Sequence, residues 1–342
     1  MQRREVLSGA LGATALLFMP HRSFSAEGKK KTCFLYDSLY LKHVTRQGHP
    51  ERPERLTAIE NSLKERDWFE KLRRIESRAA DPEIVSLVHD RNYIEKAKKE
   101  CEGGRTSLST GDTDICRDSY DVALHAVGGV LKALDHILSG QAKNAFCAVR
   151  PPGHHATPGR GMGFCVFNNA AIAARYAQKK RGVGRVLIAD WDVHHGNGTQ
   201  ETFYTDGSVF FMSTHQSPWY PNTGKIAETG EGRGKGCIMN RPFPAGAGRD
   251  EIIGAFKNDL LPAARDFRPD LIIVSAGFDS REGDPKGRFR LNDDDFRELT
   301  KIMIDIAGIS SGGRLLSVLE GGYSLEGLPL AVSAHVDELR KA

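Results

Sequence analysis

The chain has 342 residues, and its composition narrows the classes of protein to which it can belong. Its 48 basic and 44 acidic residues are interspersed, so the charge pattern predicts no nucleic-acid partner. Six scattered cysteines form no CxxC pair, which argues against both a disulfide scaffold and a thiolate zinc site. The length, with no internal repeat or low-complexity linker, favours one large α/β domain.

The first residues have a different character. Arg3 and Arg4 precede a short apolar stretch, and residues 23–26 could hold a small-residue cleavage site. This pattern predicts a secretory signal of the twin-arginine type over residues 1–26, followed by a single domain over residues 27–342. The signal predicts a periplasmic or secreted location. Because the apolar stretch is too short to span a bilayer, we also expect no stable membrane association.

Beyond residue 30, short apolar runs alternate with longer amphipathic stretches. The apolar runs are typical of strands that are covered on both faces, and they predict strands at 32–37, 145–150, 185–192, 208–214, 270–277 and 314–320. The amphipathic stretches predict helices at 52–72, 119–138, 168–180 and 250–267. Strand followed by helix, repeated, predicts an α/β fold with an open, mostly parallel sheet and helices on both faces.

Clusters of reactive residues follow four of these strands. They are RPPGHHA at 150–156, DWDVHHG at 190–196, FDSREGDP at 278–285 and GGYSLEG at 321–327. In a parallel sheet the carboxyl ends of the strands share one edge, where ligands of such folds bind. Any one cluster could be accidental, but four of them predict a site at this edge.

The stretch after the third strand suits a metal ion. In an extended segment Asp190, Asp192 and His194 share one side, and carboxylate and imidazole are good zinc ligands. An isolated DxH is more often a loop that solvates its own polar groups. Asp192 and His194 would supply two ligands, and Asp279, at the end of the apolar run LIIVSAGF, is the best-placed oxygen donor for the third.

The remaining clusters carry residues suited to proton transfer. His154 and His155 are candidates for the base and acid of a hydrolysis, and Asp190 and Asn197 could orient their rings. Tyr323 could donate a hydrogen bond to an oxyanion opposite the metal. Without further context, two histidines in a Pro-Gly turn and a tyrosine beside glycines would usually be structural.

These motifs, in this order, resemble the zinc-dependent histone deacetylase family in its class II and bacterial acetylpolyamine amidohydrolase branch. The resemblance extends over about residues 32–340 and includes RPPGHHA, GFCVFNNAAIAA, DWDVHHGNGTQ, SAGFDSREGDP and LEGGY, together with HPERPERL and GEGRGKGCIMNRPFPAG. It implies the arginase-like α/β fold and an enzyme that hydrolyses acetyl or longer acyl amides of lysine or polyamines.

The resemblance also implies roles for single residues. The ligands of one zinc ion, for which iron could substitute, would be Asp192, His194 and Asp279. His155 would be the general base and acid, His154 its electrostatic partner, and Tyr323 the group that polarises the substrate carbonyl together with zinc. The residues behind the two histidines would be Asp190 and Asn197.

Further residues would bind the substrate or a second ion. Phe164 and Tyr220 would form the walls of the acyl-lysine tunnel, although the second wall is usually phenylalanine. Asp112, or Asp114 in its place, would hold substrate amides at the rim, and Gly163 and Gly322 would line the substrate site. The arginine near the acetate exit would be Arg52. A structural potassium ion would be held by the stretch containing Asp190, Asp192 and His194, with Ser213 and Thr214.

The substrate stays open at this stage, as does the oligomeric state. Acetylpolyamine specialists tend to carry an acidic residue after the GDP segment, whereas this chain has Lys286, which favours acylated lysine peptides or other small acylated amines. Two other classes remain as alternatives. An arginase-like enzyme would bind paired manganese, and a non-catalytic binding protein would be expected to lack a ligand or Tyr323.

Overall fold

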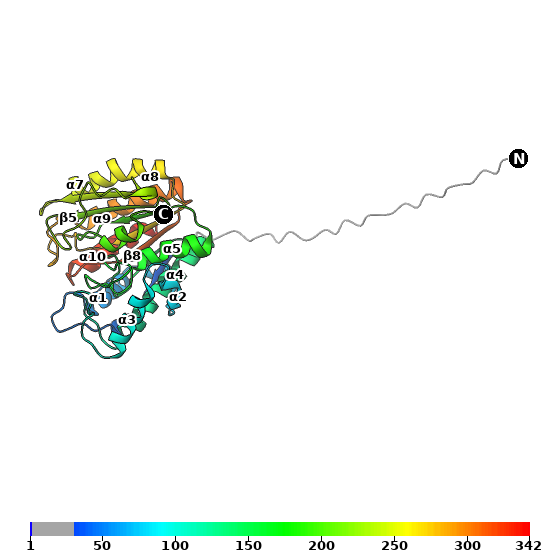
Figure 1. Cartoon of the computed structure of the whole chain (residues 1–342). Helices are drawn as coiled ribbons and strands as arrows, with labels where there is room; N and C mark the ends of the chain where they lie inside the picture. Colours follow the sequence, from blue (N-terminus) through cyan, green and yellow to red (C-terminus); the bar gives the residue numbers. More distant parts are fainter. Residues whose placement is uncertain (2–30) are drawn as a thin grey trace.

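The computed structural model describes Met1 and residues 31–342 of the chain (Figure 1). Apart from Met1, the predicted signal segment therefore lies outside the described residues. Within residues 31–342, no helix is both long enough and apolar enough to cross a membrane.

The core of the molecule is one eight-stranded sheet in which every neighbouring pair is parallel. The strand order is β2-β1-β3-β8-β7-β4-β5-β6. All six predicted strands are present, and β2 and β6 are two that the sequence did not predict. The strands are β1 (Lys31–Leu35), β2 (Arg73–Ile75), β3 (Ala142–Cys147), β4 (Val186–Asp190), β5 (Val209–Gln216), β6 (Ile238–Phe243), β7 (Leu271–Ala276) and β8 (Leu315–Leu319).

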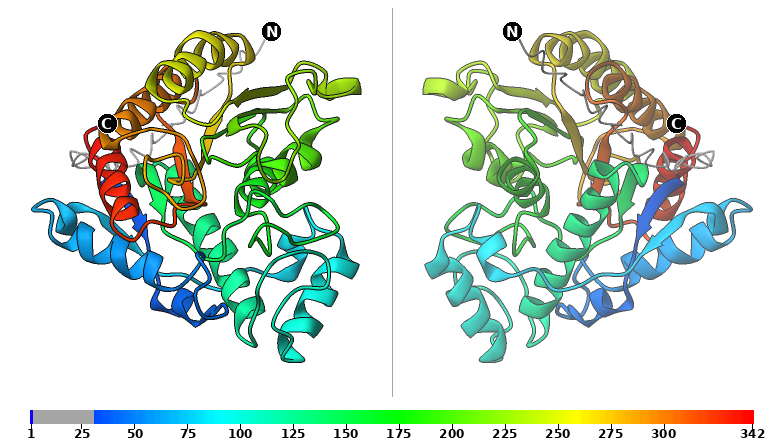
Figure 2. Two further views of the ribbon diagram at one scale, coloured as in Figure 1. Left: turned by 90° about the vertical axis from the view of Figure 1, so that its left-hand side faces the viewer. Right: turned by 90° about the vertical axis from the view of Figure 1, so that its right-hand side faces the viewer.

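Helices cover both faces of the sheet, as predicted (Figure 2). On one face α4 and α5 pack together, and α2 and α3 lie against them. On the other face α10 lies between α1 and α9, and α8 packs against α9. The helices are α1 (Glu54–Lys64), α2 (Pro82–Val85), α3 (Arg91–Glu102), α4 (Ser119–Leu138), α5 (Asn169–Arg181), α6 (Asn197–Phe203), α7 (Arg249–Ala255), α8 (Leu261–Phe267), α9 (Asp293–Ser310) and α10 (Gly327–Leu339).

Local chemistry sets several of these boundaries. The side chain of Asn168 accepts a hydrogen bond from the Ala171 amide and caps α5, and Gly182 ends the helix with a left-handed φ of 71°. The predicted helix at 250–267 consists of α7, one π-helical turn at Phe256–Leu260, and α8. Pro262, which has no N–H to donate, is the second residue of α8, just after that turn.

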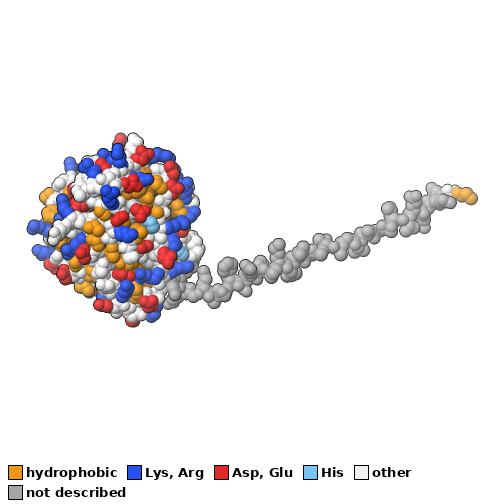
Figure 3. Space-filling view, turned by 90° about the horizontal axis from the view of Figure 1, so that it is seen from below, with side chains coloured by type: hydrophobic (Ala, Val, Ile, Leu, Met, Phe, Trp, Pro, Cys, Tyr) orange, Lys and Arg blue, Asp and Glu red, His pale blue; other side chains and the backbone are white. Residues whose placement is uncertain are grey.

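The carboxyl ends of the strands carry the polar loops, while the strands themselves are buried. Every residue of β4, β5, β7 and β8 is buried. The surface seen in Figure 3 carries acidic and basic side chains interspersed with apolar ones. The chemistry predicted from the sequence is therefore concentrated in the loops at one edge of a buried sheet.

Candidate metal centre and active site

The loop that follows β4 brings the first two predicted metal ligands together. Trp191 and Val193 are completely buried in the core, so the alternation of an extended chain turns Asp192 and His194 to the other side. Oδ1 of Asp192 lies 2.9 Å from both the amide nitrogen and the ring Nδ1 of His194. Asp192 and His194 therefore lie on the same side of this segment, with their polar atoms in contact.

The loop that follows β7 brings Asp279 to the same place. Its Oδ1 accepts a hydrogen bond of 2.9 Å from the Val193 amide, and its Oδ2 lies 3.1 Å from Nδ1 of His194. One ligand atom each from Asp192, His194 and Asp279 lies within 4.8 Å of the others. Gly321 leaves room for both carboxylates, because a Cβ atom there would come within 2.1 Å of Asp279 Oδ2 and 2.5 Å of Asp192 Oδ2.

This donor set fits a divalent cation. Two fully buried carboxylates converge on one ring nitrogen, which can carry at most one hydrogen. Burial and the neighbouring Asp192 carboxylate raise the pKa of Asp279 to about 7. A cation among the three groups would remove this electrostatic cost, and three protein ligands drawn from carboxylates and imidazoles, with one position left open, suit a catalytic zinc ion.

The tandem histidines after β3 lie beside this centre, each with a different partner. His154 Nδ1 donates a hydrogen bond of 2.9 Å to Asp190 Oδ2, and His155 Nδ1 donates one of 2.8 Å to Asn197 Oδ1. The two rings lie 4.0 Å apart between centroids. Since an amide oxygen only accepts, the His155 ring carries its hydrogen on Nδ1 and leaves the lone pair of Nε2 free.

The environments of the two rings push their pKa values apart. Burial alone would lower the pKa of His154, but the Asp190 and Asp192 carboxylates outweigh it and hold this pKa well above its usual value. Burial and the neighbouring charge on His154 hold the pKa of His155 well below its usual value. His154 is therefore suited to carry a positive charge, and His155 to accept a proton.

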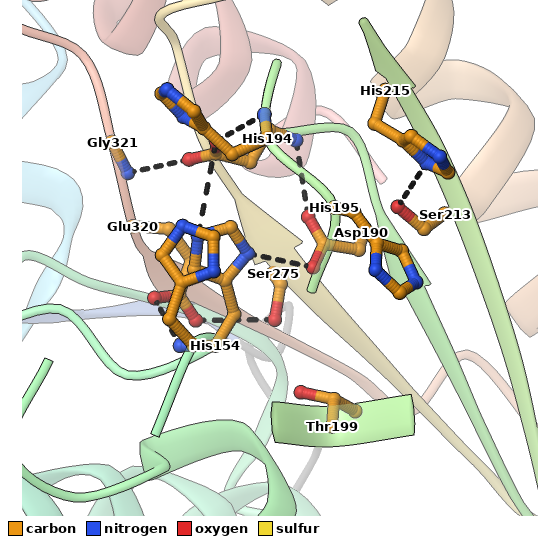
Figure 4. A network of polar contacts seen from close by, with 12 residues as sticks. His154, Asp190, His194, His195, Thr199, Ser213, His215, Ser275, Glu320 and Gly321 are labelled. Atoms are coloured by element: carbon orange, nitrogen blue, oxygen red, sulfur yellow. Dashed lines mark hydrogen bonds and ion pairs between the residues drawn. The ribbon is translucent and has the colours of Figure 1, made fainter. Parts of the chain in front are cut away.

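A glutamate that the sequence analysis did not select, Glu320, lies against the turn that carries the first histidine (Figure 4). Oε2 of the fully buried Glu320 accepts hydrogen bonds from the amides of Gly153 and His154, at 2.7 and 3.0 Å. Its Oε1 accepts a hydrogen bond from Ser275 Oγ at 3.1 Å. Burial raises the pKa of Glu320 to about 7. This residue fixes the backbone of the histidine turn.

A cavity of about 250 Å³ leads to these residues. Tyr323 lies in its lining, and its ring meets that of Phe164 edge to face at 6.0 Å. The ring of Tyr220 lies 5.1 Å from that of His155 and forms another wall. The cavity thus brings the predicted tunnel walls together with Tyr323, His155 and His194.

The predicted rim residue Asp112 also lines the cavity. Its Oδ1 accepts hydrogen bonds from the Gly163 amide at 2.7 Å and from the Tyr220 hydroxyl at 3.2 Å. Asp114, the alternative, is buried instead beside Arg46. Gly163 must stay glycine, because its φ is 57° and a Cβ atom would lie 2.3 Å from the His155 ring.

Two of the residues predicted to hold potassium, Ser213 and Thr214, lie on the adjoining strand β5. Asp190 pairs with Ser213 between β4 and β5, and both residues are completely buried. Ser213 Oγ lies 3.0 Å from His215 Nδ1, whereas Thr214 Oγ1 is buried without a hydrogen-bond partner among the described residues. Because successive side chains of a strand point to opposite faces of the sheet, Ser213 rather than Thr214 has its side chain on the same face as Asp190.

Comparison with known proteins agrees with this geometry. The model of the histone deacetylase domain matches residues 49–339. The chain belongs to the histone deacetylase family. The solved histone deacetylase domain of HDA15 superposes with a TM-score of 0.86 and 36% identity, over 91% of this chain and 89% of that one.

Relatives in this family come from distant organisms. A probable deacetylase of Archaeoglobus fulgidus is 40% identical over 86% of this chain and 82% of its own length. A histone deacetylase-like amidohydrolase of Pseudomonas aeruginosa is 38% identical over 91% and 86%. The polyamine deacetylase HDAC10 of Homo sapiens is 39% identical over 84% of this chain and 44% of its own length. The family assignment makes this chain a deacetylase that hydrolyses amide bonds, and it confirms the predicted arginase-like fold.

Sequence reasoning missed a buried charged cluster behind Tyr323. Glu51 accepts hydrogen bonds from Arg150 Nε at 2.5 Å and Nη2 at 2.7 Å, and from Arg55 Nη1 at 3.1 Å. Arg55 also donates to the carbonyl oxygens of Gly322 and Glu320, both at 2.6 Å. Arg55, in the same segment as Arg52, thus reaches the loop that carries Tyr323, while the place of Arg52 near an acetate exit stays a prediction. The i, i+4 spacing of Glu51 and Arg55 was the one feature of the local sequence from which part of this cluster could have been predicted.

Asp284 was also missed, although it stands in the GDP segment. Its Oδ2 accepts hydrogen bonds from the amides of Tyr323 and Ser324, at 2.7 and 3.0 Å. Its Oδ1 accepts one from the Lys286 amide at 2.9 Å. Asp284 therefore connects the loop after β7 to the loop after β8, which carries Tyr323.

Proposed function

We propose that the chain is a zinc-dependent deacylase that hydrolyses acetyl or longer acyl amides of lysine side chains. The observation that carries this proposal is the convergence of Asp192, His194 and Asp279 at the end of a cavity lined by Tyr323 and His155. Zinc bound by these three residues would lower the pKa of a bound water and polarise the amide carbonyl. Iron could take its place, since the same donors suit both ions.

The protein's own residues would move the protons and stabilise the developing charge. Nε2 of His155, which its bond to Asn197 leaves free, takes the proton of the attacking water and later returns it to the leaving amine. His154, paired with Asp190, stays positively charged beside the reacting atoms. The hydroxyl of Tyr323 donates a hydrogen bond to the carbonyl oxygen as negative charge develops on it.

We infer that the second ion is potassium and that it has a structural role. Carbonyl and side-chain oxygens between Asp190 and His194, with Ser213 and Thr214, would hold it. The strand register that places the buried Ser213 side chain beside Asp190 supports this proposal. Such an ion would fix the loop that carries two of the three zinc ligands.

The acyl-lysine substrate has one competitor. An acetylated polyamine is the second candidate substrate, and two observations argue for it. One relative is named polyamine deacetylase HDAC10, and the rim of the cavity carries the acidic residue Asp112. Lys286, which also lines the cavity, would repel a polyamine cation. Steady-state kinetics with an acetyl-lysine peptide and with acetylspermidine would separate the two candidates.

We propose further that the protein is exported in a folded state. The adjacent Arg3 and Arg4 before the apolar stretch support a twin-arginine signal. Fractionation of cells should find the protein in the periplasm, and replacing both arginines by lysine should retain it in the cytoplasm. Periplasmic protein in that variant would contradict the export route.

The test of the catalytic assignment is Tyr323→Phe. Removing one oxyanion donor costs about 10²–10³ in kcat, so this variant should keep its zinc and lose most turnover of an acetyl-lysine substrate. Metal analysis and circular dichroism provide the control that the centre is intact. Unchanged turnover would rule out the role of Tyr323.

A further inference from the structure

A second cavity lies at the opposite edge of the sheet from the metal centre. Its volume is about 470 Å³, larger than that of the cavity that leads to the metal centre. Two of its lining residues, Arg185 and Ser208, come directly before β4 and β5, so it lies at the amino ends of these strands. The catalytic residues follow the carboxyl ends of the strands. The deacylase chemistry therefore does not account for this cavity.

The lining of this second cavity is strongly basic. Among the described residues that line it, four are basic and one, Asp206, is acidic. The basic residues are Arg175, Lys179, Arg185 and Arg233. Over the whole chain the 48 basic residues are nearly balanced by 44 acidic ones, so this excess of positive charge is local. We refer to the space that these five residues line as the basic cavity.

Asp206 cannot balance the excess, because both of its oxygens are already engaged. Oδ2 accepts a hydrogen bond from Arg175 Nη1, and Oδ1 accepts bonds from the amide and the hydroxyl of Ser208, at 2.8 and 2.6 Å. Within residues 31–342, no ion pair or side-chain hydrogen bond involves the three remaining basic residues, Lys179, Arg185 and Arg233. Three cations therefore line the basic cavity without a counter-charge from the protein.

The three cations are carried by separate, well-defined parts of the fold. Lys179 belongs to the last turn of α5. Arg185 precedes β4, and its Cζ lies 5.8 Å from the centroid of the Phe267 ring. The backbone of Arg233 packs closely on Gly207, where a Cβ atom would come within 2.4 Å of the Arg233 carbonyl oxygen. Since three distant segments converge on one cavity, the charge cluster is a product of the fold and not of a basic run in the sequence.

A multiply charged anion is the ligand that suits this lining. Cations that share one cavity repel each other, and an anion that enters removes the repulsion. Guanidinium groups bind phosphate through paired N–H groups, and an ammonium group binds it as a point charge. Three cations exceed the charge of a single carboxylate. The volume of the cavity also falls within the range of small-molecule sites, about 300–1,000 Å³, and exceeds the needs of one bare phosphate ion.

We propose that the basic cavity binds a phosphorylated small molecule, with its phosphate groups held by Lys179, Arg185 and Arg233. The chemistry that the site recognises is two or more negative charges on phosphate. A free phosphorylated metabolite and the headgroup of a phospholipid both supply phosphate, and the experiment distinguishes these two sources. The inference goes beyond the proposed deacylase function and does not depend on it.

The experiment is calorimetric titration of the full chain with pyrophosphate, followed by co-sedimentation with vesicles of phosphatidylcholine and phosphatidylglycerol. Pyrophosphate should bind at one site per chain, and its affinity should fall as salt is added. Binding to pyrophosphate alone would assign the site to a free ligand, whereas vesicle binding that pyrophosphate displaces would assign it to a headgroup. Because pyrophosphate also binds metal ions, the titration is repeated with Asp279→Asn, which should bind it equally well.

Variants assign the binding to the basic cavity. Arg185→Gln and Arg233→Gln should each lower the affinity for pyrophosphate about tenfold, since each removes a charged partner of the phosphate groups. Arg66→Gln, at an exposed arginine just after α1, is the matched control and should leave the affinity unchanged. A thermal melt of each variant checks that the folds are comparable.

Three results would overturn the proposal. The first is that neither pyrophosphate nor the vesicles bind at low salt. The second is an affinity that stays unchanged in both Arg185→Gln and Arg233→Gln, or that falls equally in Arg66→Gln, which would indicate attraction by the overall surface charge. The third is loss of binding in Asp279→Asn, which would place the anion at the metal centre instead.

Discussion

Replacing Glu51 by glutamine should destabilise the protein strongly, because this one carboxylate serves two buried guanidinium groups. Glu51, Arg55 and Arg150 are all completely buried. Arg150 binds both oxygens of Glu51, and Arg55 lies 3.1 Å from one of them. Glutamine keeps the shape but leaves two positive charges without a counter-charge.

The size of the effect follows from this geometry. Removing one partner of a buried ion pair costs about 3–5 kcal/mol of unfolding free energy. For a folded domain of about 300 residues this lowers Tm by about 5–8 °C. Turnover should fall as well, because the Arg55 guanidinium lies 4.8 Å from the centroid of the Tyr323 ring and holds the Gly322 carbonyl.

The assay is thermal and urea unfolding followed by circular dichroism, with kcat measured at a temperature where both proteins are folded. Glu83→Gln is the matched control, since Glu83 forms an exposed ion pair with Arg91 that should contribute less than about 1 kcal/mol. A loss below about 1 kcal/mol in Glu51→Gln would show that solvent or neighbouring groups compensate the two arginines, and would refute this reasoning.

Three further predictions concern acid stability, Tyr323 and the cavity wall. Burial raises the pKa of Glu51, but Arg150 and His43 outweigh it and hold that pKa well below its usual value. The stabilisation is therefore complete above about pH 4.5 and is lost as the pH falls below it, so the Tm difference between native protein and Glu51→Gln should shrink in acid. Asp284→Asn should lower kcat about tenfold without loss of zinc, because an amide nitrogen would face backbone donors that position Tyr323; unchanged kinetics would argue against this role. Tyr220→Phe should raise KM by a few fold with little change in kcat, as Asp112 loses one of its two donors; a loss confined to kcat would contradict a role in substrate binding.

Much of the sheet could be predicted because its strands are short runs buried on both faces. β4, β7 and β8 fit this pattern throughout. β2 has only three residues, two of them exposed, and β6 contains Pro242 and only two fully buried residues. Neither strand has a hydrophobic period long enough to be recognised, and both lie at the edges of the sheet.

The predicted helix over residues 52–72 illustrates a second kind of error. α1 ends at Lys64, and a separate 3₁₀ turn covers Phe69–Lys71. The charged run from Lys64 to Asp67 has no apolar residue to continue the buried stripe. The residues of this run have a local propensity for helix. They offer no apolar side chain to pack against the core, however, and such packing supplies most of the stability of a helix in a protein.

The site shows the same division between local and distant signals. Asp192, His194 and Asp279 could be predicted together because each follows a strand of one parallel sheet. The bond between Glu51 and Arg150 joins residues 99 positions apart, and nothing in either local pattern indicates it. Contacts of this kind depend on the complete fold.

The most direct test of the account is the metal content of native protein and Asp279→Asn, measured by mass spectrometry on protein purified without added metal. The native chain should carry about one zinc or iron ion, because three protein ligands with an open position are typical of a mononuclear catalytic site. The variant should lose most of it, whereas a control at Asp284, which contacts only backbone amides, should keep it. Full occupancy after Asp279→Asn, or two manganese ions in the native chain, would contradict the proposed centre.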